Sequence, residues 1–385
     1  MRILLLSADY PPLVGGVADY TDRLAHALAG LGHEVSVLTS ARATQAAAAP
    51  AGSASVRVIA TVSSWGPAAL LVIAQQVQAQ APQVVALQYV PTMYGRGGIA
   101  PGIALLPALL RRHTPARVVV TLHEVAVSWR LGPRRAAQAT AQYAQMLALV
   151  LGSHRVLVTN HRYARIVQRW TRARVTPQVL PVGANILPAG GDDPARSAVR
   201  QQLGIGEGPL LGSMSALGVG DQPAHLLTVL QRLPKARLVL LGGLPEHGAR
   251  WSEVEALARR AGVVERVGRT GYWPPAALSR ALATLDLFVH ARDVGASTRS
   301  TALAAALAHA LPIVAYRGIE TSDLFADGEN ILLAPAGDAR ALAARAAQAL
   351  ASPALRGRLR AGARRLYERH FSWERIAQQF LDVAA

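Results

Sequence analysis

The sequence predicts two α/β domains in tandem, each with a parallel sheet covered by helices on both faces. The length of 385 residues suits two domains of about 150 to 200 residues each. Short β-rich runs alternate with helical segments along the chain, which is typical of parallel sheets. A stretch rich in Gly and Pro, from Pro181 to Pro194, separates the two series of segments and is the predicted linker.

The first series starts with the apolar run at residues 1–7. The turn that follows contains Gly15 and Gly16, and a helix is predicted over residues 17–31 from apolar residues spaced three and four apart. Further strands of the first domain are predicted at residues 35–38, 56–59, 84–87, 118–122, 156–159 and 179–180.

The second series predicts a similar sheet. Its strands are predicted at residues 210–212, 238–241, 263–267, 287–290 and 313–316, and its helices at 224–232, 252–261, 275–283 and 301–310. In such sheets ligands bind beyond the carboxyl ends of the strands, where loops meet helix N-termini. The loops after the strands are therefore where chemistry is expected.

The composition excludes several kinds of chemistry. The chain has no cysteine, so disulfides, thiolate nucleophiles and cysteine-ligated metals are excluded. The N-terminal apolar run ends at Ser7 and meets Pro11 and Pro12, which favours a buried strand over a signal peptide. No run of about 18 apolar residues predicts a transmembrane helix, so the cytoplasm is the expected location.

Positive charge is concentrated in the first half of the chain. The formal net charge is +17, and Lys235 is the only lysine among 40 basic residues. The segment 96–174 contains 13 arginines and a single acid, Glu124. Such a field attracts phosphates, whether of an anionic membrane, a phosphorylated substrate or nucleic acid. The alternative is a solvated surface on which arginine merely replaces lysine.

Two loops of the first domain are candidate sites. Gly15 and Gly16 precede a helix, where backbone N–H groups can bind a phosphate or a sugar hydroxyl; simple turn geometry is the alternative. His123 and Glu124 directly follow a predicted strand. A histidine there can hydrogen-bond a bound sugar or steady a developing charge, and a purely structural histidine is the alternative.

A third candidate lies between the predicted strand 287–290 and the helix that starts at Thr301. Hydroxyl groups, a helix N-terminus and one arginine converge there, which is typical of an anion site. An ordinary N-cap accounts for only one of these hydroxyls. The residues of this predicted diphosphate site are Ser297, Thr298, Arg299, Ser300 and Thr301. Arg269 is the second arginine expected to bind phosphate, and we expect charge reversal at Arg299 to abolish turnover without disturbing the fold.

No metal site or cofactor is predicted. The 11 histidines show no HxxxH or HExxH spacing, and no DxD pair follows a strand. The absence of GxSxG and Walker A motifs argues against an α/β-hydrolase and a P-loop ATPase.

Several motifs together make the chain resemble the retaining GT-B glycosyltransferases of family 4 over nearly its whole length. They are Tyr10-Pro11-Pro12, Gly15-Gly16-Val17, Gly32-His33-Glu34-Val35, Ala308-His309-Ala310-Leu311-Pro312, Asp327-Gly328-Glu329-Asn330 and Phe371-Ser372-Trp373-Glu374. The resemblance implies an acceptor domain at residues 1–185, completed by a returning helix at 371–385, and a nucleotide-sugar domain at 186–370. It also implies that Gly16 and His123 lie near the reacting sugar, and that transfer proceeds with retention and without metal.

The chain departs from the family at four positions. The two glutamates usual in the family align with Ser297 and Ala305, and an Arg and a Lys usual after the strand 210–212 align near Ser213 and Gln222. Arg299 and the hydroxyls around it, with Ser213, are predicted to bind the diphosphate instead.

Three functions follow from these observations. The first is transfer of a sugar from a nucleotide diphosphate donor to an acceptor, for which lipid-linked sugars of a surface polysaccharide at an anionic membrane fit the arginine-rich segment 96–174. The second is a non-catalytic partner or scaffold for an active transferase, which the missing family residues favour. Nucleic-acid binding is disfavoured because only 5% of the residues are aromatic and no binding motif occurs.

Overall fold

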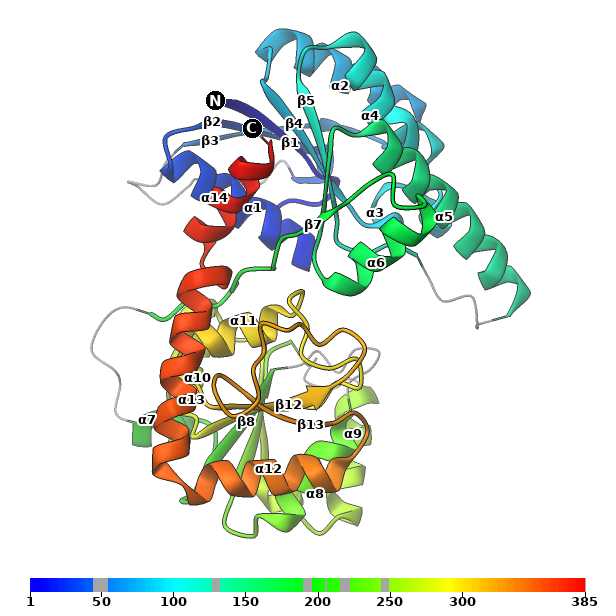
Figure 1. The fold of residues 1–385 in the computed structure, drawn as a ribbon. Coiled ribbons are helices and arrows are strands. Elements are labelled where there is room, and N and C mark those ends of the chain that lie inside the picture. Colours follow the sequence, from blue (N-terminus) through cyan, green and yellow to red (C-terminus); the bar gives the residue numbers. More distant parts are fainter. Residues whose placement is uncertain are drawn as a thin grey trace. The chain divides into compact units, whose positions relative to one another are not determined.

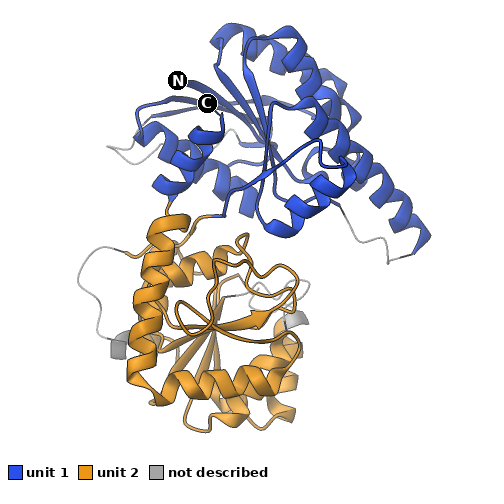
Figure 2. Ribbon diagram, viewed as in Figure 1, with its two compact units in different colours: residues 1–182, 373–385 blue, residues 183–372 orange. Residues whose placement is uncertain are grey.

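The computed structural model divides the chain into two compact units (Figure 2). Unit 1 comprises Met1–Val182 and Trp373–Ala385, and unit 2 comprises Gly183–Ser372. The boundaries expected from the sequence, at residues 185 and 371, lie close to these. The structure describes residues 1–43, 55–126, 132–189, 196–204, 206–214, 222–243 and 249–384. The second half of the predicted linker, from Gly190, lies outside the described residues.

Unit 1 contains a parallel sheet of seven strands in the order β3-β2-β1-β4-β5-β6-β7. Its strands are β1 Arg2–Leu6, β2 Glu34–Ser40, β3 Val56–Val62, β4 Val84–Tyr89, β5 Arg117–Leu122, β6 Arg155–Val158 and β7 Gln178–Val179. The first three strands progress in one direction, and the chain then returns to place β4 on the other side of β1. The topological switch point of unit 1 therefore lies between β1 and β4.

Helices cover both faces of this sheet (Figure 1). The helices of unit 1 are α1 Gly16–Gly30, α2 Pro67–Gln80, α3 Pro91–Tyr94, α4 Pro101–His113, α5 Pro133–Gly152, α6 His161–Trp170 and α14 Trp373–Ala384, with 3₁₀ turns at Ala41–Ala43 and Arg96–Gly98. The C-terminal helix α14 packs against α1 within unit 1. Helices α2, α4 and α5 cover the other face.

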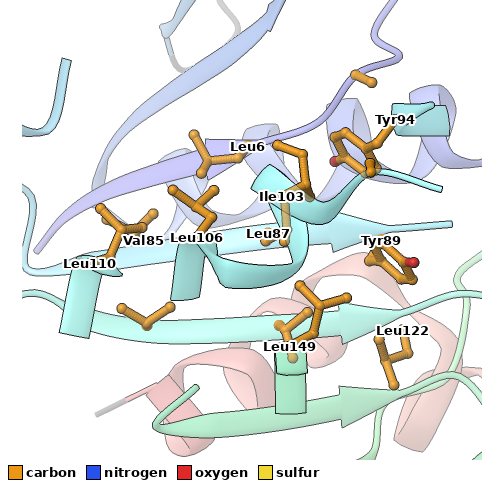
Figure 3. Packing of buried hydrophobic residues seen from close by; sticks show 14 of the residues in the cluster. Leu6, Val85, Leu87, Tyr89, Tyr94, Ile103, Leu106, Leu110, Leu122 and Leu149 are labelled. Carbon is orange, nitrogen blue, oxygen red and sulfur yellow. The ribbon is translucent and has the colours of Figure 1, made fainter. Parts of the chain in front are cut away.

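The core between the sheet and helices α2, α4 and α5 explains why apolar residues follow one another in the strands. Alternate residues of β1, β4 and β5 face this core, among them Leu6, Leu87 and Leu122. Leu106 and Leu110 pack onto them from α4 (Figure 3). Because the sheet is buried on both faces, its strands read as continuous apolar runs in the sequence.

Unit 2 repeats this plan with a parallel sheet in the order β10-β9-β8-β11-β12-β13. Its strands are β8 Leu210–Met214, β9 Arg237–Leu241, β10 Val267–Gly271, β11 Leu287–His290, β12 Ile313–Arg317 and β13 Leu332–Pro335. Its helices are α7 Arg196–Gln202, α8 Pro223–Arg232, α9 Ala249–Arg260, α10 Pro275–Ala283, α11 Thr301–Ala308, α12 Ala339–Ala351 and α13 Pro353–Leu366, followed by a π-helical turn at Tyr367–Phe371. The switch point of unit 2 lies between β8 and β11.

One predicted strand is displaced in the structure. The apolar run at 263–267 was expected to be a strand, but Val264–Arg266 form a 3₁₀ turn and the strand is Val267–Gly271. Strand β13 is an additional strand that the sequence did not predict. In the described part of the chain, no helix combines the length and the hydropathy that crossing a bilayer requires.

Candidate functional site

The loop after β1 is held in place at the switch point of unit 1. The Tyr10 hydroxyl donates a hydrogen bond of 2.7 Å to Oδ1 of Asp22 on α1. The Ser7 hydroxyl donates to the carbonyl oxygen of Asp9, also at 2.7 Å. The first bond connects the loop to α1 and the second fixes the backbone within the loop, so the residues before α1 are held against this helix.

Gly15 and Gly16 lie where this loop enters α1. Gly15 has extended backbone angles that any residue adopts, with φ 177°. A Cβ atom at either glycine would meet no neighbour within 4 Å among the described residues, and no side chain caps the helix. Neither backbone strain nor packing requires glycine here, and the first-turn N–H groups of α1 are left accessible to a ligand. Their role in ligand binding remains a prediction.

His123 follows β5 and is held in place by three neighbours. Its backbone N–H donates to the Tyr89 carbonyl oxygen at 2.9 Å. Its Nε2 lies 2.9 Å from Oε1 of Gln88 at the end of β4. Its ring contacts the ring of Tyr20 on α1 edge-on, with 4.6 Å between centroids, and Tyr20 in turn contacts Trp373 of α14. Residues far apart in the sequence thus orient one imidazole at the carboxyl edge of the sheet.

Burial decides the protonation state of His123. Removal from water lowers the pKa of the imidazole to about 3, so the ring is neutral at pH 7. Because Nε2 donates its proton to Gln88, Nδ1 of the neutral ring is an acceptor. His123 can therefore accept a hydrogen bond from a hydroxyl, but it carries no positive charge to steady a developing anion. Glu124 is exposed, so its carboxylate does not share the buried surroundings of His123.

In unit 2 the β11–α11 loop, residues 291–300, is joined to the loop after β12, residues 318–322. The Glu320 N–H donates to the carbonyl oxygen of Val294 at 2.8 Å. Gly295 has a positive φ of 87°, and a Cβ at this position would overlap the loop after β12. Glycine is required at position 295 both by its backbone angle and by this close approach.

This close approach pairs Arg299 with a buried carboxylate. Nε of Arg299 lies 3.0 Å from Oε2 of Glu320, and the two side chains are 30% and 1% exposed. The guanidinium group has five donors, so an arginine that binds a carboxylate through Nε can also bind an anion. Charge reversal at Arg299 would place a second carboxylate against Glu320. The ion pair therefore leads us to expect that such a variant is destabilised and does not keep its fold intact.

The hydroxyls around Arg299 differ in their surroundings. Ser300 is the N-cap of α11, where its hydroxyl accepts a hydrogen bond of 3.3 Å from the Leu303 N–H. The side chains of Ser297 and Thr298 are buried, whereas Thr301 is half-buried. An ordinary cap explains Ser300, and Arg299 and Thr301 are the better-placed groups for an anion. Binding of a diphosphate at this loop remains a prediction.

The structure places Ser213 near this loop and Arg269 away from it. Ser213 is buried close to the end of β8, which pairs with β11 at the switch point. Arg269 lies on the edge strand β10, so β9 and β8 separate it from β11. Its guanidinium stacks over the Trp251 ring at 4.6 Å from the centroid. Arg269 and Arg299 therefore do not form one cluster.

Sequence reasoning missed three residues that shape these sites, namely Gln88, Tyr20 and Glu320. Gln88 and Glu320 follow the predicted strands at 84–87 and 313–316, so the rule that selected the other loops could also have found them. Tyr20 is one of the apolar residues whose spacing predicts the helix over residues 17–31, and this spacing does not indicate its contact with His123. Within the described ranges, no group of three His, Asp or Glu side chains is arranged to hold a metal ion.

Two Rossmann-like units, each with polar residues at its switch point, are typical of the GT-B glycosyltransferases. The observed architecture confirms the predicted fold. The chain belongs to glycosyltransferase family 4 within this class. The model of the family described as "Glycosyl transferase 4-like domain" matches residues 15–183, and that described as "Glycosyl transferases group 1" matches residues 211–352. The chain is thus a glycosyltransferase, as predicted.

Named relatives agree with this assignment. The chain is 26% identical to the GDP-mannose-dependent alpha-(1-6)-phosphatidylinositol monomannoside mannosyltransferase of Mycolicibacterium smegmatis, over 91% of this chain and 90% of that protein. It is 33% identical to the D-inositol 3-phosphate glycosyltransferase of Xylanimonas cellulosilytica, over 56% of this chain and about half, 51%, of that relative.

Solved structures show the same fold. Sucrose-phosphate synthase from Thermosynechococcus elongatus superposes with a TM-score of 0.78 at 19% identity, covering 99% of this chain and 97% of that chain. HepE of Anabaena in complex with UDP gives a TM-score of 0.72 at 17% identity, covering 99% of both chains.

Proposed function

We propose that the chain transfers a hexose from a nucleoside diphosphate sugar, with unit 2 binding the donor and unit 1 the acceptor. The observation that carries this proposal is the arrangement at the switch point of unit 2. There the N-terminus of α11, Arg299 and Ser213 belong to neighbouring strand ends. Two relatives support a nucleotide donor by their names, one as GDP-mannose-dependent and the other as a complex with UDP.

The chemistry assigned to these residues is positioning and charge stabilisation. As the sugar leaves, negative charge develops on the diphosphate, and Arg299 and the positive end of α11 stabilise it. Glu320 keeps the guanidinium group of Arg299 in one orientation. His123, being neutral, accepts a hydrogen bond from a sugar hydroxyl. The acceptor hydroxyl oxygen bonds to the anomeric carbon on the face from which the diphosphate departs as the bond between that carbon and the phosphate oxygen breaks, and the departing phosphate takes the hydroxyl proton. Attack on this face gives retention, and arginine supplies positive charge without a metal.

The proposed acceptor is a lipid-linked sugar at the inner face of an anionic membrane. The arginine-rich segment 96–174 supplies the attraction to anionic headgroups. The name of the Mycolicibacterium relative, a phosphatidylinositol monomannoside mannosyltransferase, supports an acceptor of this class. The protein itself would work from the cytoplasm as a peripheral enzyme.

One observation favours the alternative of a non-catalytic partner. Ala305 and Ser297, which occupy the positions of the two family glutamates, are both buried, and Ala305 is fully enclosed in the apolar core of unit 2. These positions therefore offer no carboxylate to a donor sugar. A scaffold that retains the fold without turnover would tolerate this loss.

A thermal-shift series with UDP, GDP, ADP and TDP and their sugar conjugates, in EDTA, separates the two functions. A nucleotide at 100 times its dissociation constant stabilises the unit that binds it by about 2.7 kcal/mol, or roughly 5 to 10 °C in a domain of this size. Stabilisation by one nucleotide, followed by donor turnover, supports the transferase. No response to any nucleotide contradicts the proposal and favours the partner function.

A further inference from the structure

An open groove lies between α2 and α4 of unit 1, at the amino-terminal edge of the sheet. Its volume is about 810 Å³, and apolar side chains form most of its walls, including Leu70, Val77, Leu106 and Leu110. Leu106 and Leu110 also pack onto the sheet (Figure 3). His123 follows the carboxyl end of β5, so the groove and His123 lie at opposite edges of the sheet.

The two helices beside the groove expose apolar side chains to solvent. Helix α2 has 14 residues without a single charge, and Leu71 on it is 69% exposed. On α4, Leu105 is 55% exposed and Leu109 is 41% exposed. These two leucines are four residues apart, so they share one face of the helix. Leu109 lines the groove itself, and Leu71 and Leu105 are exposed on the two helices that flank it, which suits an apolar partner.

Positive charge borders this surface. The last turn of α4 carries Arg111, Arg112 and His113, and His113 lines the groove together with Arg2. The chain contains no Asp or Glu between Glu34 and Glu124, a stretch that includes all of α2 and α4. The border of the groove therefore has no acid from its own elements to neutralise it.

His154, before β6, shows that further arginines gather at the same edge. Partial burial lowers the pKa of its imidazole, and the positive charges of Arg111, Arg117 and Arg155 lower it further. These guanidinium groups therefore all lie near His154, whose Nδ1 accepts a hydrogen bond of 3.0 Å from the backbone N–H of Val118 on β5. An apolar surface with a cationic border matches a molecule that has a hydrocarbon chain and an anionic head.

We propose that this surface docks on a membrane of anionic phospholipid. One acyl chain enters the groove between α2 and α4, and the phosphate groups bind the cationic border that includes Arg111 and Arg112. The inference gives a location to the membrane contact proposed above and rests on that part of the proposed function. Its test measures lipid binding instead of sugar transfer, so the docking surface and the proposed transferase activity can be refuted separately.

Flotation of the full chain with vesicles tests the surface. Vesicles of phosphatidylcholine with phosphatidylglycerol are compared with vesicles of phosphatidylcholine alone, at low and moderate salt. The chain is expected to float with the anionic vesicles. Arg111→Gln/Arg112→Gln is expected to weaken partitioning about 25-fold, at roughly a factor of five per arginine. Leu71→Gln/Leu109→Gln is expected to weaken it at least tenfold, and in both salts.

Matched controls distinguish the contribution of this surface to flotation from the contributions of net charge and of exposed apolar side chains elsewhere. Arg360→Gln/Arg364→Gln removes the same charge from α13 of unit 2, outside the arginine-rich segment 96–174, where both arginines are exposed. Ile319→Gln removes an aliphatic side chain of similar exposure, 62%, in unit 2. Both control variants are expected to float like the wild type. Equal losses in the control and test variants would overturn the proposal, as would binding to neither vesicle.

Labelling identifies the occupant of the groove. Phosphatidylglycerol with a photoreactive group on its acyl chain is expected to label peptides from α2 and α4 in vesicles. Labelling confined to other helices would overturn the proposal. So would equal labelling by a photoreactive free fatty acid without vesicles, or a dimer in sedimentation that Leu71→Gln/Leu109→Gln dissociates, because the groove would then bind a soluble ligand or a second copy.

Discussion

Replacing Arg299 with glutamine is expected to destabilise unit 2 by about 3 kcal/mol. The carboxylate of Glu320 is 1% exposed, and Arg299 is its partner at 3.0 Å. Removing one partner of a buried ion pair costs about 3 to 5 kcal/mol because the other charge is left uncompensated. The lower end of this range applies because Arg299 itself is 30% exposed. In a domain of this size the loss corresponds to a fall in Tm of roughly 6 to 12 °C.

The double variant Arg299→Gln/Glu320→Gln separates stability from function. Two amides can hydrogen-bond to each other without a buried charge, so this variant is expected to recover most of the lost stability. If Arg299 binds the donor diphosphate, the double variant still lacks a charge-assisted hydrogen bond of about 1.5 to 3 kcal/mol. Its affinity for the nucleoside diphosphate is then about 10- to 150-fold weaker than that of the wild type.

Calorimetric titration of each variant with the nucleotide found by the thermal-shift series measures this affinity, and differential scanning calorimetry measures stability. Glu320→Gln alone serves as the control that retains Arg299. A stable double variant with wild-type affinity would refute the assignment of Arg299 to the donor. An unchanged Tm in Arg299→Gln would refute the energetic role of the ion pair.

Three further predictions concern stability. His123 and His290 have a pKa of about 3 through burial. The unfolded chain takes up protons on them below about pH 6.5 while the folded chain does not, so stability falls by about 1.4 kcal/mol per pH unit for each. Denaturant melts from pH 7 to 5 should show a flatter slope for His123→Gln, and an unchanged slope contradicts this. Gln88→Leu leaves Nε2–H of His123 buried without its acceptor, so it should lower the free energy of unfolding by about 1 to 3 kcal/mol in the same melts at pH 7. An unaltered free energy of unfolding argues against that bond. On α13, Gly362→Ala should destabilise the fold because its Cβ would overlap the backbone at residue 329. Gly357→Ala should stabilise the fold by about 0.5 to 1 kcal/mol, because a Cβ there meets nothing within 4 Å. Equal effects of the two variants in thermal melts would refute the packing argument.

The strands of the two sheets were largely predictable because buried parallel strands are continuous apolar runs. Of the two exceptions, β10 and β13, β10 shows the limit of this signal. It is an edge strand of sequence VGRTG in which only the last residue is buried, and the apolar residues before it belong to a turn. Half-buried strands lack the pattern from which strands are predicted.

The sequence predicted which loops form the candidate sites, but not which side chains contact one another in them. Strand ends selected His123 and Arg299, because parallel strands bring their carboxyl ends to one edge. Their partners Gln88 and Glu320 are 35 and 21 residues away in the sequence. Whether such side chains meet depends on the register between strands and on the close approach of two loops, which no local pattern records.

We propose that this chain transfers the sugar without a second protein. Proton NMR of the purified full chain with each nucleoside diphosphate sugar in EDTA tests it most directly, because slow donor hydrolysis reports turnover without knowledge of the acceptor. We expect a single kind of nucleoside diphosphate to be released, with the freed sugar first appearing in the anomeric form that it had in the donor. No turnover of any donor, or turnover that begins only when a second protein is added, would contradict it.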